Sequence, residues 1–213
     1  MAMSSWAVMV RRNGAACSSL RGDVVPGGFG GRGFEGKVAA LGACRRTRAP
    51  ALGICLGMQA MAVEAARAGG LADATSEEVA ADAEHRVVAV LCDQAGREGS
   101  GGSMRLGAYP AVLRTGSVAA GHYGATRCTE RHRHRYEVDP AYLGYVGAGG
   151  LVVSGTSPDG RLVELLEDPA HPFYVGTQAH PELKSRPERP HPLFAGLLGA
   201  ALARSAGHVR PAA

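Results

Sequence analysis

The chain has 213 residues, of which 46% are hydrophobic and 20% are charged. This composition predicts one globular α/β-sized domain, and 31 glycines, about double the usual share, predict many loops and close backbone approaches. The formal net charge of +4 is modest, and the basic residues are scattered apart from short clusters at 45–48 and 131–135, which argues against nucleic-acid binding.

The sequence also argues against membrane and secretory segments. No apolar run approaches the roughly 18 residues of a membrane span, and near the N-terminus the charges follow the apolar stretch, which is the reverse of a signal peptide. We therefore expect a cytoplasmic protein. The five cysteines, at positions 17, 44, 55, 92 and 128, form no CxxC pair. They predict reduced thiols rather than a disulfide framework or a zinc site.

The first half of the chain alternates strands and helices. Residues 1–19 show no hydrophobic periodicity, which predicts an unrelated or disordered segment. Structure is expected to begin with a short buried strand at 24–25. A helix is predicted at 35–46, a buried strand at 49–54, and a helix directly after it that a Gly pair closes at 69–70. This order indicates a parallel α/β sheet with helices on its faces.

The second half is predicted to be rich in strands. Strands are expected at 85–93, 104–113, 131–138, 150–157, 161–167 and 172–180, and a last helix at 191–205. The Gly/Ser-rich stretch 94–103 predicts a loop. Ser157-Pro158-Asp159-Gly160 is a strong turn signal, so the strands on either side of it are predicted to form a hairpin.

Two phosphate-binding patterns overlap after the first strand, and both are incomplete. Residues 28–33 match G-x-G-x-x-G, but no acidic residue follows about twenty positions later to hold a ribose. Residues 31–37 match G-x-x-x-x-G-K, but Val38 stands where a hydroxyl residue would hold magnesium. The stretch PGGFG is better explained as a source of backbone N–H groups near a reacting carbonyl.

The stretch GICLG, residues 53–57, has the form of a nucleophile elbow with cysteine in place of serine. Cys55 would occupy a strained turn at a helix N-terminus, where the helix dipole favours the thiolate. The N–H of Leu56 would serve as one oxyanion donor. From the elbow alone, a nucleophile and a buried structural cysteine are equally good interpretations.

A thiolate nucleophile needs a base and a group that orients it. His180-Pro181-Glu182 supplies both, because residues two apart at a strand end point the same way. His132 and His134 also alternate, but no third ligand lies near them in sequence and the neighbouring arginines would repel a cation, so metal binding is disfavoured. Arginines at this place are better suited to a substrate carboxylate.

Together these segments resemble the class I glutamine amidotransferase domain of the CTP synthase family, from about residue 20 to residue 204. The resemblance is carried, in the family's order, by VVPGGFGGRGFEGKVAA, LGICLGMQ, GGSMRLGAYP, ERHRHRYE, SGTSPDGRLVE, TQAHPELKSRP and RPHPLF. It implies a flavodoxin-like parallel sheet flanked by helices, with an added β-rich region and with the family's N-terminal strands missing. It divides the chain into the segment 1–19, a partial amidotransferase domain at 20–204 and a tail at 205–213.

The resemblance also implies roles for individual residues. Cys55, His180 and Glu182 would form the catalytic triad, and Gly28 and Leu56 would provide the oxyanion N–H groups. The glutamine substrate would be held by Gly28, Leu56, Gly57, Met58, Gln59, Glu78 and Arg135. Ala179 and Leu183 stand where the family usually has phenylalanines, so looser seating of His180 is expected.

The implied function is hydrolysis of L-glutamine to supply ammonia for the conversion of UTP to CTP in pyrimidine nucleotide biosynthesis. No metal or cofactor is expected in this chain, because ATP, UTP and Mg²⁺ belong to the synthetase domain, which would be a separate domain or subunit. Two other hypotheses stay open: a non-catalytic truncated remnant or binding module, and a stand-alone γ-glutamyl hydrolase-like enzyme with the same triad.

Overall fold

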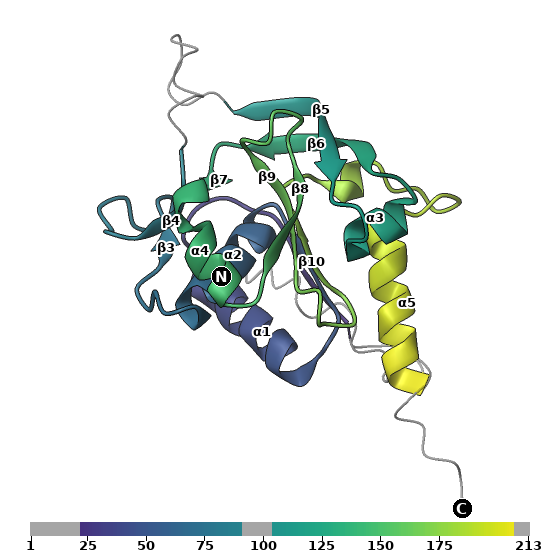
Figure 1. The fold of residues 1–213 in the computed structure, drawn as a ribbon, viewed down its shortest axis with the longest axis horizontal. Helices are drawn as coiled ribbons and strands as arrows, with labels where there is room; N and C mark the ends of the chain where they lie inside the picture. Colours follow the sequence, from purple (N-terminus) through teal and green to yellow (C-terminus); the bar gives the residue numbers. More distant parts are fainter. Residues whose placement is uncertain (1–21, 91–103, 207–213) are drawn as a thin grey trace, which may run out of the picture.

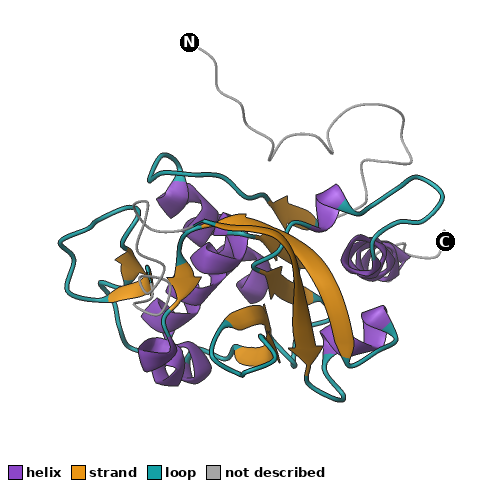
Figure 2. Ribbon diagram, turned by 90° about the horizontal axis from the view of Figure 1, so that it is seen from above, coloured by secondary structure: helices purple, strands orange, loops and turns teal. Residues whose placement is uncertain are grey.

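A computed structural model describes residues 22–90 and 104–206. Its centre is a curled sheet of seven strands, and the strands are drawn in orange in Figure 2. In spatial order the strands are β1 (Asp23–Val25), β2 (Ala51–Ile54), β10 (Tyr174–Thr177), β9 (Val163–Glu167), β8 (Val152–Thr156), β5 (Arg105–Leu113) and β6 (Arg127–His134). The first three are parallel, and every later pair is antiparallel. The predicted α/β fold is confirmed, but the β-rich half extends the same sheet.

A second sheet has three short strands beside the first. These are β3 (Thr75–Ser76), β4 (Arg86–Ala89) and β7 (Glu137–Val138). The strand predicted at 85–93 therefore belongs to this small sheet. The strand predicted at 131–138 is wrong as one element, because the chain leaves β6 at Arg135 and Tyr136 and enters the other sheet as β7.

The helices cover both faces of the large sheet (Figure 1). The α-helices are α1 (Phe34–Thr47), α2 (Leu56–Ala68), α3 (Val118–Tyr123), α4 (Leu143–Ala148) and α5 (Pro192–Ala206), and two 3₁₀ turns are η3 (Pro140–Tyr142) and η4 (Pro181–Leu183). One apolar core joins α1, α2 and α4 to one face of the sheet. A second core joins α3 and α5 to the other face. The short helices α3 and α4 were not predicted, because each has only six residues.

The predicted hairpin is confirmed, since β8 and β9 pair antiparallel around the turn at Ser157. In this turn the Ser157 hydroxyl donates to Asp159 Oδ1 at 2.5 Å and accepts from Leu162 N at 2.9 Å. The segment 1–19, the loop 94–103, the residues 207–213 of the tail and the cysteines at 17 and 92 lie outside the described residues. Within the described ranges, no helix has both the length and the apolar character needed to cross a membrane.

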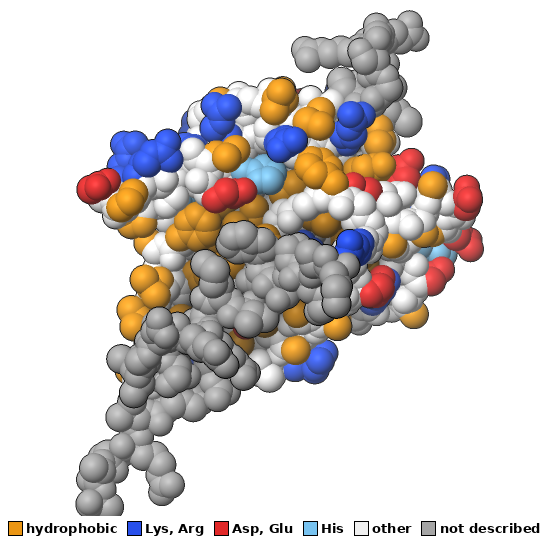
Figure 3. Space-filling model, turned by 180° about the vertical axis from the view of Figure 1, so that it is seen from behind, with side chains coloured by type: hydrophobic (Ala, Val, Ile, Leu, Met, Phe, Trp, Pro, Cys, Tyr) orange, Lys and Arg blue, Asp and Glu red, His pale blue; other side chains and the backbone are white. Residues whose placement is uncertain are grey.

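The strand β6 carries its histidines inward and its arginines outward. Glu130, His132 and His134 are buried, whereas Arg131 and Arg133 are exposed. Strand alternation explains this division, because successive side chains point to opposite faces of a sheet. Figure 3 shows basic side chains along the end of the molecule where β5 and β6 lie.

Candidate active site around Cys55

Cys55 lies between β2 and α2, at the turn that the sequence predicts. Its backbone has φ 51° and ψ −108°, and its side chain is buried, with 2% of its surface exposed. A positive φ is costly for a residue with a side chain and persists only where the surrounding structure imposes it. The Cys55 N–H donates to Thr177 O at 2.7 Å, so strand β10 helps to hold this conformation.

The glycines on both sides of Cys55 are required by close packing. A Cβ atom on Gly57 would lie 2.1 Å from the carbonyl oxygen of Val25 in β1. A Cβ atom on Gly53 would lie 2.8 Å from the Gly57 carbonyl and 2.9 Å from Met61 Sδ. The first turn of α2 therefore lies directly against two strands, and this arrangement presents Cys55 at the helix N-terminus.

His180 follows β10 and is oriented by Glu182. His180 Nδ1 is 2.6 Å from Glu182 Oε1, and the side chains are 14% and 47% exposed. The contact predicted from the sequence is present, but the strand alternation that we invoked for it is wrong. Residues 181–183 form the 3₁₀ turn η4, and this turn brings the two side chains together.

The imidazole of His180 also adjoins Cys55. A Cβ atom built on Gly27 would contact both His180 Cε1 at 3.1 Å and Cys55 Cβ at 3.3 Å, so the two side chains flank this glycine. His180 Nε2 is buried and makes no hydrogen bond of good geometry in this structure. The Cys55 thiol group and Glu182 together raise the pKa of His180 to about 10, against the effect of burial. The site thus favours a positively charged imidazole beside Cys55.

The glycine-rich loop after β1 closes the site on another side. Gly28 and Leu56 are neighbours, because a Cβ atom on Gly28 would lie 3.5 Å from Leu56 Cδ2. Lys37 of α1 donates to Pro26 O at 2.6 Å, and burial lowers its pKa while Cys55 raises it. Lys37, the lysine of the incomplete G-x-x-x-x-G-K pattern, therefore anchors the glycine-rich loop after β1. Glu78 Oε1 accepts from Gly30 N at 2.6 Å, so this predicted substrate residue also touches the loop.

Gln59 lies one helical turn after Cys55, is buried, and is bonded to Gln178, which is not among the predicted site residues. Its Nε2 donates to Tyr136 O at 3.0 Å and to Gln178 Oε1 at 3.2 Å. Gln59 Oε1 is buried without a partner. Gln178 is fully buried, and its Nε2 lies 3.7 Å from Cys55 Sγ. No local motif marks Gln178, since only the position of β10 beside β2 brings it to Cys55.

Two other predicted substrate residues take different positions. Met58 is fully buried, and its side chain lies against Gly176 of β10, which leaves its backbone as the part available to a ligand. Arg135 is exposed on the bend between β6 and β7. This bend also carries the Tyr136 carbonyl that Gln59 contacts.

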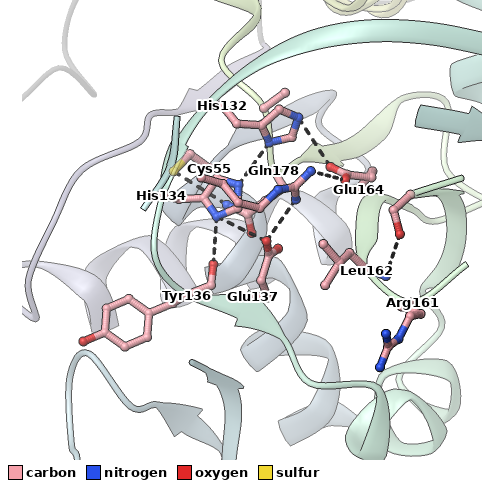
Figure 4. A network of polar contacts seen from close by, with 12 residues as sticks. Cys55, His132, His134, Tyr136, Glu137, Arg161, Leu162, Glu164 and Gln178 are labelled. Atoms are coloured by element: carbon pink, nitrogen blue, oxygen red, sulfur yellow. Dashed lines mark hydrogen bonds and ion pairs between the residues drawn. The ribbon is translucent and has the colours of Figure 1, made fainter. Parts of the chain in front are cut away.

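Five ionisable side chains form a buried ring close to Cys55 (Figure 4). They are Arg105, His132, His134, Glu137 and Glu164. Arg105 donates to Glu137 Oε1 at 2.9 Å and to Glu164 Oε1 at 2.7 Å. His132 Nδ1 lies 3.0 Å from His134 Nε2, and His132 Nε2 lies 3.5 Å from Glu164 Oε2. Burial, assisted by the charge of Arg105, lowers the pKa of His132 to about 2 and that of His134 to about 3. Both imidazoles are therefore uncharged at neutral pH.

The two histidines of this ring bond to each other rather than converge on a third ligand. Within the described part of the chain, the one group of side chains placed to share an ion is the surface cluster Asp73, Glu84 and His85. None of the predicted site residues belongs to it.

The other described cysteines have different surroundings from Cys55. Cys44, Cys55 and Cys128 are free thiols. Burial, with the nearby carboxylates of Asp23 and Glu130 respectively, raises the pKa of Cys44 and of Cys128 to about 12. These two side chains therefore stay protonated near neutral pH, whereas Cys55 faces the imidazole of His180.

The chain is similar to known proteins over most of its length. The family model "Glutamine amidotransferase class-I" matches residues 9–200. The chain is 56% identical over 194 residues to a CTP synthase of Nocardia farcinica and 54% identical over 203 residues to one of Mycobacterium avium. These matches cover 88% and 92% of this chain but 34% and 35% of the relatives, so the chain spans about a third of their length.

A solved structure is similar over most of the fold. The glutaminase domain of Trypanosoma brucei CTPS, with bound acivicin, superposes with a TM-score of 0.80 and 37% identity. The match covers 86% of this chain and 71% of that one. A putative GMP synthase subunit from Thermoplasma acidophilum, at 16% identity and a TM-score of 0.53, shares the fold.

Proposed function

This chain belongs to the class-I glutamine amidotransferase family, as a glutaminase domain of the CTP synthase type, and from this premise we propose that it hydrolyses L-glutamine through Cys55, His180 and Glu182. One observation carries the proposal. Cys55, whose backbone is strained, adjoins the imidazole of His180, and Nδ1 of that imidazole lies 2.6 Å from Glu182 Oε1. A buried structural cysteine needs neither the strain nor the oriented base.

The first half of the reaction forms a thioester. The Cys55 thiolate attacks the side-chain carboxamide carbon of glutamine, and the negative oxygen of the tetrahedral intermediate accepts hydrogen bonds from the N–H groups of Leu56 and Gly28. Protonated His180 gives its proton to the departing nitrogen, so ammonia leaves and a glutamyl thioester remains on Cys55. The charge on His180, which Cys55 and Glu182 favour, supplies this acid.

The second half regenerates the thiolate. Neutral His180 accepts a proton from a water molecule that attacks the thioester, and the tetrahedral intermediate collapses to glutamate and the Cys55 thiolate. Glu182 keeps the imidazole oriented in both halves. Gln59, with its unpaired Oε1, is placed to accept a hydrogen bond from the substrate.

The ammonia would serve a synthetase domain that converts UTP to CTP. In this proposal ATP, UTP and Mg²⁺ bind to that synthetase domain, which the chain would meet as a separate domain or subunit. The amino acid substrate of this chain is L-glutamine, and its own reaction needs no cofactor.

Release of glutamate from L-glutamine by the purified chain tests the proposal. Cys55→Ala is expected to abolish release, and Glu182→Gln is expected to lower it roughly 100-fold, the lower end of what an oriented acid–base residue contributes. Acivicin, the compound bound to the Trypanosoma brucei domain, is expected to modify Cys55, which peptide mass spectrometry would locate. Equal glutamate release by the wild-type and Cys55→Ala proteins would refute the proposed triad.

A further inference from the structure

We infer that Gln178 is a positioning residue for Cys55, with a side-chain N–H directed at Sγ that stabilises the thiolate over the thiol. The inference deepens the proposed function and rests on it, because it concerns the same nucleophile. In this inference the effect of Gln178 on the reaction passes through the sulfur atom of Cys55.

The sheet register places the two residues side by side. Strands β2 and β10 are parallel neighbours whose last paired residues are Ile54 and Thr177. The residues that follow them directly are Cys55 and Gln178. Cys55 N donates to Thr177 O at 2.7 Å, and Gln178 N donates to Glu164 O at 2.9 Å. Both backbones are therefore held by main-chain hydrogen bonds, and the side chains meet with Nε2 3.7 Å from Sγ.

The backbone carbonyl of Tyr136 determines how the side-chain amides of Gln59 and Gln178 are oriented. The oxygen of Tyr136 can only accept, so the Gln59 atom 3.0 Å away must be the NH₂ group. The same NH₂ group lies 3.2 Å from Gln178, so the Gln178 atom that faces it must be the oxygen. The remaining end of Gln178, its NH₂ group, therefore faces Cys55.

This orientation favours the ionised sulfur. A hydrogen bond is stronger when its acceptor is charged, and in the low dielectric of a buried site it is stronger still. Gln178 and Cys55 are 0% and 2% exposed. Two cationic groups also act on Cys55, namely His180 after β10 and Lys37 of α1. Gln178 differs from both because its donor group carries no charge.

The test is the pH dependence of Cys55 alkylation by iodoacetamide, followed on the Cys55 peptide by mass spectrometry so that other cysteines do not contribute. Gln178→Met retains the length of the side chain and removes the N–H donor. We expect the pH of half-maximal rate to rise by about one unit, which is about a tenfold slower reaction at pH values below both midpoints. The plateau rate at high pH is expected to stay unchanged.

A second variant and a measurement on the wild-type protein keep the test decisive. Gln59→Met removes the anchor of Gln178 but not its N–H, so a smaller shift in the same direction is expected. In the wild-type protein, the side-chain amide proton resonances of Gln178 are expected to move with the same midpoint as alkylation, and to lose that response in Cys55→Ala. Unchanged midpoints in both variants, or an amide signal insensitive to Cys55, would overturn the inference.

The two proposals fail separately. Alkylation needs no glutamine, so a chain without glutaminase activity that still shows the shifted midpoint would refute the proposed function and leave the role of Gln178 intact. A lowered plateau rate with an unchanged midpoint would refute the inference by showing that Gln178 has a structural role only. The proposed function would stand, because it is tested by glutamate release from the wild-type protein.

Discussion

Replacing Gly57 with alanine perturbs the contact that places the nucleophile. The new Cβ atom would lie 2.1 Å from Val25 O and 3.0 Å from the Val25 carbonyl carbon. Ordinary contact begins near 3.4 Å, so β1 and the first turn of α2 must separate by about 1.3 Å, the difference between 3.4 and 2.1 Å. Neither partner is the end of a flexible side chain, so the overlap must be relieved by backbone movement.

The expected cost follows from this overlap. Overpacking a well-packed core costs about 1–3 kcal/mol, and a clash with the backbone belongs at the upper end, at about 3 kcal/mol. The higher helix propensity of alanine than of glycine offsets at most about 1 kcal/mol of this loss in unfolding free energy. The net loss is about 2 kcal/mol of unfolding free energy. For a chain of this size, that corresponds to a fall in Tm of about 4–8 °C.

Thermal unfolding followed by circular dichroism measures this change. Gly36→Ala is the matched control, because it lies within α1 and its Cβ atom would meet nothing within 4 Å. We expect that variant to unfold at or above the wild-type temperature. Alkylation of Cys55 should also slow in Gly57→Ala, since the elbow moves with α2. A Gly57→Ala protein that unfolds within about 1 °C of wild type would show that the close packing of α2 on β1 is wrong.

Two further predictions concern buried charge. Arg105→Met removes the cation that pairs with the buried carboxylates of Glu137 and Glu164. We expect the free energy of unfolding, measured with urea, to fall by about 3–5 kcal/mol. Changing both carboxylates to glutamine in the same protein should recover most of this loss. The pKa of His180, about 10, should be visible as the midpoint of its NMR titration and should fall in Glu182→Gln. Because this pKa lies above the ordinary value of 6.5, the stabilisation by the bound proton is complete below pH 6.5 and is lost as the pH rises toward 10. A midpoint unmoved by Glu182→Gln would show that the carboxylate does not act on the imidazole.

The parallel half of the fold follows from local patterns in the sequence. Short apolar runs at β1 and β2, each followed by a helical pattern, predict parallel strands because a crossover helix returns the chain in the same direction. The elbow at Cys55 has its own signature, since only small residues fit two positions before and after the nucleophile. These features are local, and one sequence is enough to predict them.

The antiparallel half depends on contacts that no local pattern reveals. Residues 131–138 alternate as a strand throughout, so nothing in them predicts that the chain changes sheets at Tyr136. The change depends on distant partners, because β6 pairs with β5 and β7 pairs with β4. The same reasoning explains why Gln178 was missed: its role depends on the register of β10 against β2.

Main-chain hydrogen bonds hold the backbone of His180 in place, and Glu182 orients its imidazole. The His180 N–H donates to Arg131 O of β6 at 2.8 Å, and its carbonyl accepts from Leu183 N at 3.1 Å within η4. Ala179, which stands where the family usually has phenylalanine, is buried, and its N–H donates to Thr177 Oγ1 at 3.2 Å. Backbone hydrogen bonds do not depend on the size of these side chains. The backbone of His180 is therefore held without the aromatic side chains that the family usually has, and Glu182 directs the imidazole at Cys55.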